Sequence, residues 1–168
     1  MEINLTTWKR GSQRAPHKPL LLLYALGKWK NGRRDFPWAQ VKVDVAYLIE
    51  QFGGNARPEA SNPFVRLQKD GNGRIWTVDG PLVLDASGNP SIKLLNENNN
   101  VARFTAEFEN SISDRKVFDN LVSDLLVEHF SETQFEDLLQ ACGLVESNLS
   151  TYTKRRRDPE FRQNVLDA

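Results

Sequence analysis

Residues 15–27 read APHKPLLLLYALG, and this stretch predicts the central element of the fold. Pro19 suits the first position of a helix, where the N–H group that proline lacks would have no partner within the helix. The run Leu20–Leu26 is apolar on every side, which predicts a helix surrounded by other segments of the protein rather than facing water. We therefore expect a buried helix from Pro19 to about Lys30, with the rest of the domain packed around it.

The hydrophobic pattern predicts three further helices on the C-terminal side of this one. Apolar residues recur at helical spacing over Pro37–Phe52, and Gly53 then ends the helix. The segment Asp114–Phe130 repeats apolar residues at i, i+4 and i+8 and carries acidic residues on its other face. Ser131–Gln134 has the pattern of a capping box, so the last of these helices should begin there and end at Gly143.

A small β-sheet is expected between these helices. Phe64–Leu67 and Ile75–Val78 alternate apolar and polar residues, and Asp70–Gly73 between them has the composition of a hairpin turn. The predicted fold class is α+β, a mainly helical domain with a small antiparallel β-sheet. We expect this sheet to pack against the helices that begin at Pro19 and Pro37.

The length of 168 residues suits one compact domain with a short appendage. We expect a domain over residues 1–145 and a linker over residues 146–168. In that linker Asp158 and Pro159 have the pattern of a helix start, which would lead to a C-terminal domain outside this sequence. The chain has one cysteine, no signal-peptide pattern and no run of about 18 apolar residues. These features predict a cytoplasmic protein that does not enter a membrane.

Charge is distributed unevenly along the chain, although its net charge is zero. Residues 1–34 contain eight basic residues and one acid, whereas residues 107–137 contain nine acids and two basic residues. A localised basic region suits binding to one face of an anionic polymer such as DNA. Two alternatives stay open: either the charges are solvated helix faces, or the acidic helices of residues 114–142 form a protein-interaction surface.

The sequence offers little material for catalysis. Its two histidines, His17 and His129, and its single Cys142 are too few for a cysteine-rich zinc site, which needs four ligands. Neither a Walker loop nor a dinucleotide-binding glycine fingerprint occurs in the chain. We therefore predict no catalytic residue, no metal site and no cofactor in this chain.

The beginning of the first predicted helix is the best candidate for a phosphate contact. It would carry Arg14, His17 and Lys18, and the N-terminus of a helix favours anions through its unpaired N–H groups and its partial positive charge. Pro16 and Pro19 restrict the backbone on both sides of the pair, which limits the entropy lost on binding. The alternative is that His17 caps the helix and Lys18 is only solvated.

Three motifs give the sequence a family resemblance. APHKPLLLLYALG resembles the opening signature of the sulfur-binding domains, the phosphorothioate readers of type IV restriction endonucleases. Residues 62–68, NPFVRLQ, followed by Asp70 and Gly71, resemble the aromatic-Pro-Phe-Trp-x-Leu block of that family, and residues 88–91 resemble one of its loops. Residues 155–168 resemble the segment that leads into an HNH nuclease domain in such proteins. The resemblance spans roughly residues 13–143.

The resemblance implies a sulfur pocket at the corner formed by Asn62 and Pro63. Sulfur is larger and softer than oxygen and accepts hydrogen bonds poorly, so an apolar cavity penalises oxygen more than sulfur. Pro63 would offer ring C–H groups and no N–H donor that could reward oxygen. This chain departs from the family pattern here, because Asn62 stands where an aromatic residue is usual and Val65 replaces a common Trp.

The function that the resemblance implies is recognition of double-stranded DNA with phosphorothioate linkages, as the targeting domain of a probable HNH restriction endonuclease. Homodimer formation through the full-length protein belongs to the same expectation. The alternative functions are a reader of another DNA modification or of unmodified sequence, or a protein-interaction adaptor. In the expected complex, the phosphates and base edges of the DNA are contacted by Gln13, Arg14, His17, Lys18, Arg66, Ser91 and Lys93.

Overall fold

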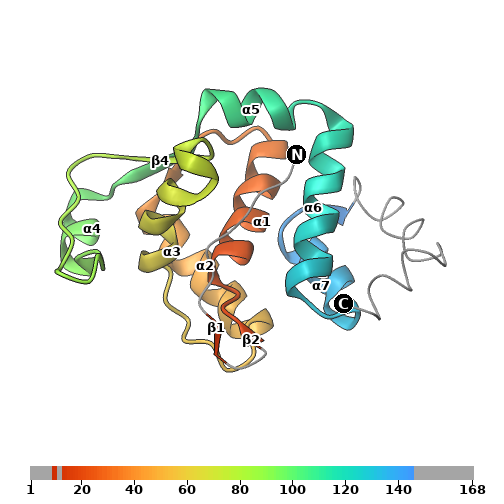
Figure 1. The fold of residues 1–168 in the computed structure, drawn as a ribbon, viewed down its shortest axis with the longest axis horizontal. Coiled ribbons are helices and arrows are strands. Elements are labelled where there is room, and N and C mark those ends of the chain that lie inside the picture. The colour runs from red at the N-terminus through yellow and green to blue at the C-terminus, as the bar shows by residue number, and fades with distance from the viewer. Residues whose placement is uncertain (1–8, 11–12, 146–168) are drawn as a thin grey trace.

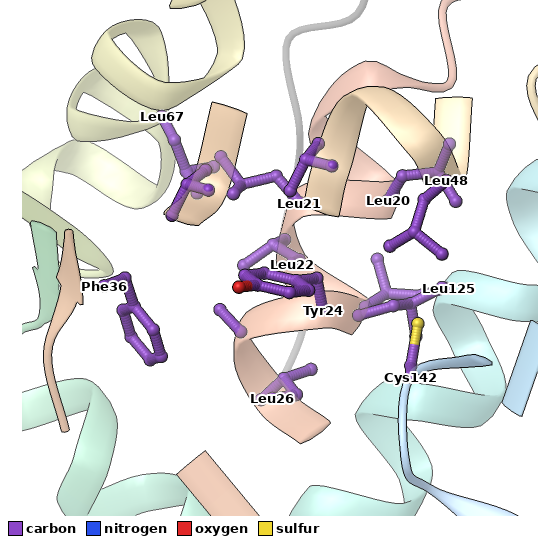
Figure 2. Packing of buried hydrophobic residues seen from close by; sticks show 14 of the residues in the cluster. Leu20, Leu21, Leu22, Tyr24, Leu26, Phe36, Leu48, Leu67, Leu125 and Cys142 are labelled. Carbon is purple, nitrogen blue, oxygen red and sulfur yellow. The ribbon is translucent and has the colours of Figure 1, made fainter. Parts of the chain in front are cut away.

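A computed structural model describes residues 9–10 and 13–145, and the side chains of residues 15–145. Helix α1 (His17–Lys30) lies at the centre of the fold, with helices on both sides of it (Figure 1). The side chains of Leu20 to Leu23 are completely buried, which confirms the helix predicted from the leucine run. Figure 2 shows Leu20 beside Leu48 of α2 (Trp38–Phe52), with Leu125 of α6 (Arg115–His129) in the same buried cluster.

The segment after the last helix passes very close to the backbone of α1. A Cβ atom placed on Gly27 would lie 1.7 Å from the carbonyl oxygen of Cys142, so this crossing requires glycine. That segment follows α7 (Phe135–Ala141), and the capping box predicted at Ser131 is present before it. Gly143 ends α7 with a φ of +72°, as expected from the sequence.

The strand predicted over residues 64–67 is wrong, because this segment is helical. Helix α3 (Ser61–Arg66) runs into a short 3-10 segment, η1 (Leu67–Gly73). Proline is tolerated in the first turn of a helix, where its missing N–H has no partner within the helix to lose, so Pro63 fits this assignment better than a strand interior. The turn expected at Asp70–Gly73 is present, because Gly71 and Asn72 have φ values of +60° and +57°. It ends η1 instead of joining two strands.

The sheet is antiparallel and three-stranded in the order β3–β5–β4, which confirms the α+β class. Only one of its strands corresponds to a predicted strand. It consists of β3 (Phe36–Pro37), β4 (Trp76–Asp79) and β5 (Val101–Phe104). Trp76 lies opposite Phe104, and Phe36 lies opposite Ala102. The predicted strand over residues 75–78 is therefore present, but its partner comes from a distant segment that the sequence pattern did not reveal.

Two short helices were also missed. Helix α4 (Ile92–Asn98) lies in a projection away from α1, and α5 (Ala106–Ile112) leads from the sheet to α6 (Figure 1). The projection is tied to the body of the domain at its base, where the Trp38 indole donates to Asn96 Oδ1 at 2.8 Å. None of the helices among the described residues is long and apolar enough to cross a bilayer.

Candidate nucleic-acid interface

Helix α1 begins with two of the predicted DNA-binding residues, and both make long-range contacts. His17 Nε2 lies at hydrogen-bond distance, 2.8 Å, from the carbonyl oxygen of Arg57 in the loop before α3. Lys18 Nζ forms an ion pair with Asp70 Oδ2 at 2.7 Å, with the two side chains 12% and 2% exposed. His17 makes no side-chain cap of α1, and Lys18 is mostly shielded from solvent. Both residues therefore connect α1 to the α3–η1 segment.

The other N-terminal candidates lie in a short hairpin that leads into α1. Strand β1 (Lys9–Arg10) pairs antiparallel with β2 (Gln13–Arg14). The register places Lys9 opposite Arg14 and Arg10 opposite Gln13. Three of the four paired residues are basic, so this ribbon continues the positive character of the α1 N-terminus. A two-stranded ribbon is narrow enough to enter the major groove of DNA.

The proposed sulfur corner lies in the first turn of α3. Pro63 is buried there, and Asn62 is half-buried and reaches further toward the surface. Glu59 lies just before the turn, and its carboxylate accepts hydrogen bonds from the backbone N–H of Ser61 and from the side-chain amide of Asn62. The contact between His17 and the Arg57 carbonyl brings the start of α1 to the loop that leads into this corner.

Arg66 is at the opposite end of α3 and contacts the loop that precedes α4. Its Nη2 donates to the carbonyl oxygen of Ser87 at 3.1 Å and to Asn89 Oδ1 at 2.7 Å. The carboxylate of Asp85 closes the same loop by accepting the N–H groups of Asn89 and Ser87 at 2.9 Å each. These hydrogen bonds, that of Asn89 first, hold the pKa of the Asp85 carboxyl below its usual range.

Ser91 and Lys93 lie beyond this loop on α4. Ser91 caps the helix, and its hydroxyl accepts the N–H of Leu94 at 3.3 Å. The side chain of Lys93 is 83% exposed and lies 4.0 Å from Glu97, one turn further along the helix. Lys93 is therefore available to a partner, whereas Ser91 has a structural role in the helix start.

The structure joins the predicted residues into one region through α3. His17 contacts the Arg57 carbonyl in the loop that leads into α3, and the last turn of α3 holds the loop before α4 through Arg66. Three residues of this region were missed by the sequence analysis, namely Arg57, Glu59 and Asp70. Asp70 was quoted only as part of a motif, and no local pattern marks it as the partner of Lys18.

Groups suited to catalysis are not gathered in this region. No cluster of three His, Cys, Asp or Glu side chains that could hold a metal occurs among the described residues. Cys142 is buried, and burial raises the pKa of its thiol to about 12, which keeps it in the unreactive neutral form. The side chain of His129 is 5% exposed and lies 3.6 Å from Glu128 on the same helix.

Several solved structures are similar to this fold. The sulfur binding domain of ScoMcrA complexed with phosphorothioated DNA has a TM-score of 0.75 and 25% identity, over 85% of this chain and 92% of that one. The sulfur binding domain of SprMcrA, also complexed with phosphorothioated DNA, has a TM-score of 0.71 and 19% identity, over 86% and 91% of the two chains. No curated protein sequence matches the chain.

A longer relative places this fold within a larger protein. The type IV phosphorothioation-dependent restriction endonuclease ScoMcrA has a TM-score of 0.76 and 24% identity, over 88% of this chain but 32% of that enzyme. A family model described as the ScoMcrA-like DNA sulfur-binding domain matches residues 3–147. That match includes both segments of the predicted recognition surface, the start of α1 and the corner at Asn62. The chain belongs to the family of ScoMcrA-like DNA sulfur-binding domains.

Proposed function

We propose that this chain binds double-stranded DNA that carries phosphorothioate linkages, and that it directs a type IV restriction endonuclease to such DNA. The observation that carries the proposal is the family match over residues 3–147. The fold shared with the sulfur binding domain of ScoMcrA, which was solved on phosphorothioated DNA, agrees with it.

Basic residues near the start of α1 supply the general affinity for DNA in this proposal. Arg14, His17 and Lys18 contact backbone phosphates, which both modified and plain DNA present. Asp70 fixes the position of the Lys18 ammonium, and the Arg57 carbonyl fixes the ring of His17. Holding both side chains in place before binding reduces the entropy that complex formation must lose.

The second half of the proposed interface lies around the far end of α3. Arg66 reads base edges from there, and Gln13 reads them from strand β2 of the N-terminal hairpin, since amide and guanidinium groups match the donor and acceptor pattern of the major groove. Arg66 already uses Nη2 to hold the loop of residues 87–89, so its contact with a base would use the remaining N–H groups. Ser91 and Lys93 would contact the DNA backbone from the projection that carries α4.

Sulfur recognition is proposed at the corner of Asn62 and Pro63. A non-bridging sulfur keeps the negative charge of the phosphate but accepts hydrogen bonds poorly, so it loses less than oxygen in a site without donors. Placing oxygen there without a partner costs about 1–3 kcal/mol, and about 1.4 kcal/mol corresponds to a tenfold preference. Because Pro63 is buried, the sulfur would contact the exposed edge of this corner beside Asn62.

We also propose the setting in which the domain acts. The chain covers 32% of the ScoMcrA enzyme. In this proposal a nuclease of the HNH type, linked through residues 146–168, would supply the cleavage, as the resemblance of residues 155–168 implies. Those linking residues and their predicted helix start lie outside the described residues. Cytoplasmic location and homodimer formation by the full-length protein belong to the same proposal.

A reader of a flipped base is the nearest competing function. Such a reader needs aromatic residues that enclose the base. Trp38 and Trp76 are instead buried in the core, where Trp76 stacks on Phe36 at a ring distance of 5.4 Å. Among the described tryptophans, Trp29 is half-buried and stacks on Phe118. A gel shift that compares phosphorothioate, base-modified and plain duplexes of one sequence at fixed salt separates these functions.

A further inference from the structure

The hydrogen-bond donors at the start of α3 are occupied within the protein. The backbone N–H of Ser61 donates to Glu59 Oε1, and the backbone N–H of Asn62 lies 3.5 Å from Glu59 Oε2. Pro63 has no N–H, and the N–H of Phe64 donates to the carbonyl oxygen of Ala60 at 3.0 Å. The backbone of this corner therefore offers no free N–H over four successive residues.

The side chain of Asn62 is directed by the same carboxylate. Its amide nitrogen Nδ2 lies 3.4 Å from Glu59 Oε2, while Oδ1 is buried without a hydrogen-bond partner. The reverse orientation of the amide would bring Oδ1 against the carboxylate, where two acceptors repel each other. Glu59 therefore determines which end of the Asn62 amide faces away from it, and that end is an acceptor.

We propose that Glu59 is a specificity-determining residue, which keeps the N–H donors of Ser61 and Asn62 away from the bound DNA backbone. The inference rests on the proposed function, since it concerns the corner that would hold the sulfur. An available donor would stabilise a phosphate oxygen much more than a sulfur, because oxygen is the better acceptor. By binding the donors itself, Glu59 removes this advantage of oxygen and leaves the preference for sulfur intact.

The inference accounts for the residue that departs from the family pattern. An aromatic side chain before Pro63 would bring no amide donor, whereas Asn62 brings two N–H bonds on its side chain. Glu59 accepts from this amide and so offsets part of that difference, and its negative charge also repels the DNA backbone. This repulsion acts on both kinds of DNA, since a phosphorothioate and a phosphate carry the same charge. Glu59 therefore reduces overall affinity while preserving the preference.

The test measures dissociation constants of the 168-residue chain for phosphorothioate and plain duplexes of one sequence at one salt concentration. Glu59→Ala should strengthen binding to plain DNA more than binding to modified DNA, so the preference should fall by about tenfold, the equivalent of one regained hydrogen bond. Glu50→Ala is the matched control, because it removes one negative charge from an exposed position on α2. It should change both affinities by the same factor.

Two further variants keep the test decisive if the loss of Glu59 loosens α3. Glu59→Gln retains the size of the side chain and should lower the preference in the same direction. Adding Asn62→Leu to Glu59→Ala removes the freed side-chain amide and should recover the part of the preference that this amide had cost, while the backbone N–H groups stay released. An unchanged preference in Glu59→Ala and Glu59→Gln, with the wild-type chain still preferring modified DNA, overturns this inference alone. A wild-type chain without any preference overturns the proposed function instead.

Discussion

Lys18 Nζ lies 2.7 Å from Asp70 Oδ2, and this ion pair joins the start of α1 to the segment that follows α3. The two side chains are 12% and 2% exposed, so water screens the pair very little. The pair connects Lys18, a proposed phosphate-binding residue on α1, with η1, which directly continues the helix α3 that carries Asn62 and Pro63. It therefore fixes the two halves of the proposed site relative to each other.

Lys18→Ala should destabilise the fold as well as weaken DNA binding. The substitution removes the ammonium that pairs with the buried carboxylate of Asp70, and breaking a buried ion pair in this way costs about 3–5 kcal/mol. The measurement is the free energy of unfolding from urea denaturation. Lys93→Ala is the control, since the exposed pair of Lys93 with Glu97 should contribute less than about 1 kcal/mol. Equal losses of unfolding free energy in the two variants would show that the Lys18–Asp70 pair stabilises the fold no more than the exposed pair does.

Arg14→Ala should weaken binding to modified and plain DNA by the same factor. The reason is that Arg14 is proposed to contact phosphate charge, which the two ligands share. The slope of log affinity against log salt should also become shallower by about one for the lost phosphate contact. Dissociation constants for both duplexes at several salt concentrations check this. A variant that loses only the preference for sulfur would reverse the role assigned to Arg14.

Pro63→Ala should act mainly on modified DNA. It removes part of the apolar wall and introduces an N–H donor, so the preference for sulfur should fall by about 1 kcal/mol or more. Because Pro63 is buried, the melting temperature of the variant must be measured beside its two dissociation constants. If both affinities fall equally in a folded variant, the sulfur pocket lies elsewhere than at this corner.

Cys142 should make the stability of the domain fall at alkaline pH. Burial raises the pKa of this thiol from 9.0 to about 12, so the folded protein keeps a proton that the unfolded chain loses above about pH 9. The raised pKa therefore contributes stability that is fully present below pH 9 and is lost progressively as pH rises toward 12. Unfolding free energies between pH 8 and pH 11 should decline less steeply for Cys142→Ala than for the wild-type chain. Parallel pH profiles would contradict this assignment.

The sequence predicted the elements whose hydrophobic pattern is long. Helices α2 and α6 each extend over 15 residues, so their apolar residues recur often enough to define a helical period, and α1 was found from its continuous apolar run after Pro19. Residues 64–67 offered only four alternating positions, which fit a strand or a helix equally well. Strand β5 was missed because its partners are β3 and β4, and both pairings join segments that are distant in sequence.

The candidate site shows the same division between local and long-range information. His17, Lys18, Asn62 and Pro63 were found because they lie in contiguous motifs. The residues that position them were not found, because Asp70 lies 52 positions from Lys18 and the Arg57 carbonyl lies 40 positions from His17. Glu59 is close to Asn62 in sequence, but only the direction of its carboxylate reveals that it binds the donors of the corner.

The most direct test of the account is the ratio of two dissociation constants for the 168-residue chain. The duplexes have one sequence and differ only in a single non-bridging sulfur on each strand, and both are measured at one physiological salt concentration. We expect tighter binding of the phosphorothioate duplex by about tenfold or more, as an apolar site without donors predicts. Equal affinities for the two duplexes would contradict the proposed recognition of sulfur, however tightly both were bound.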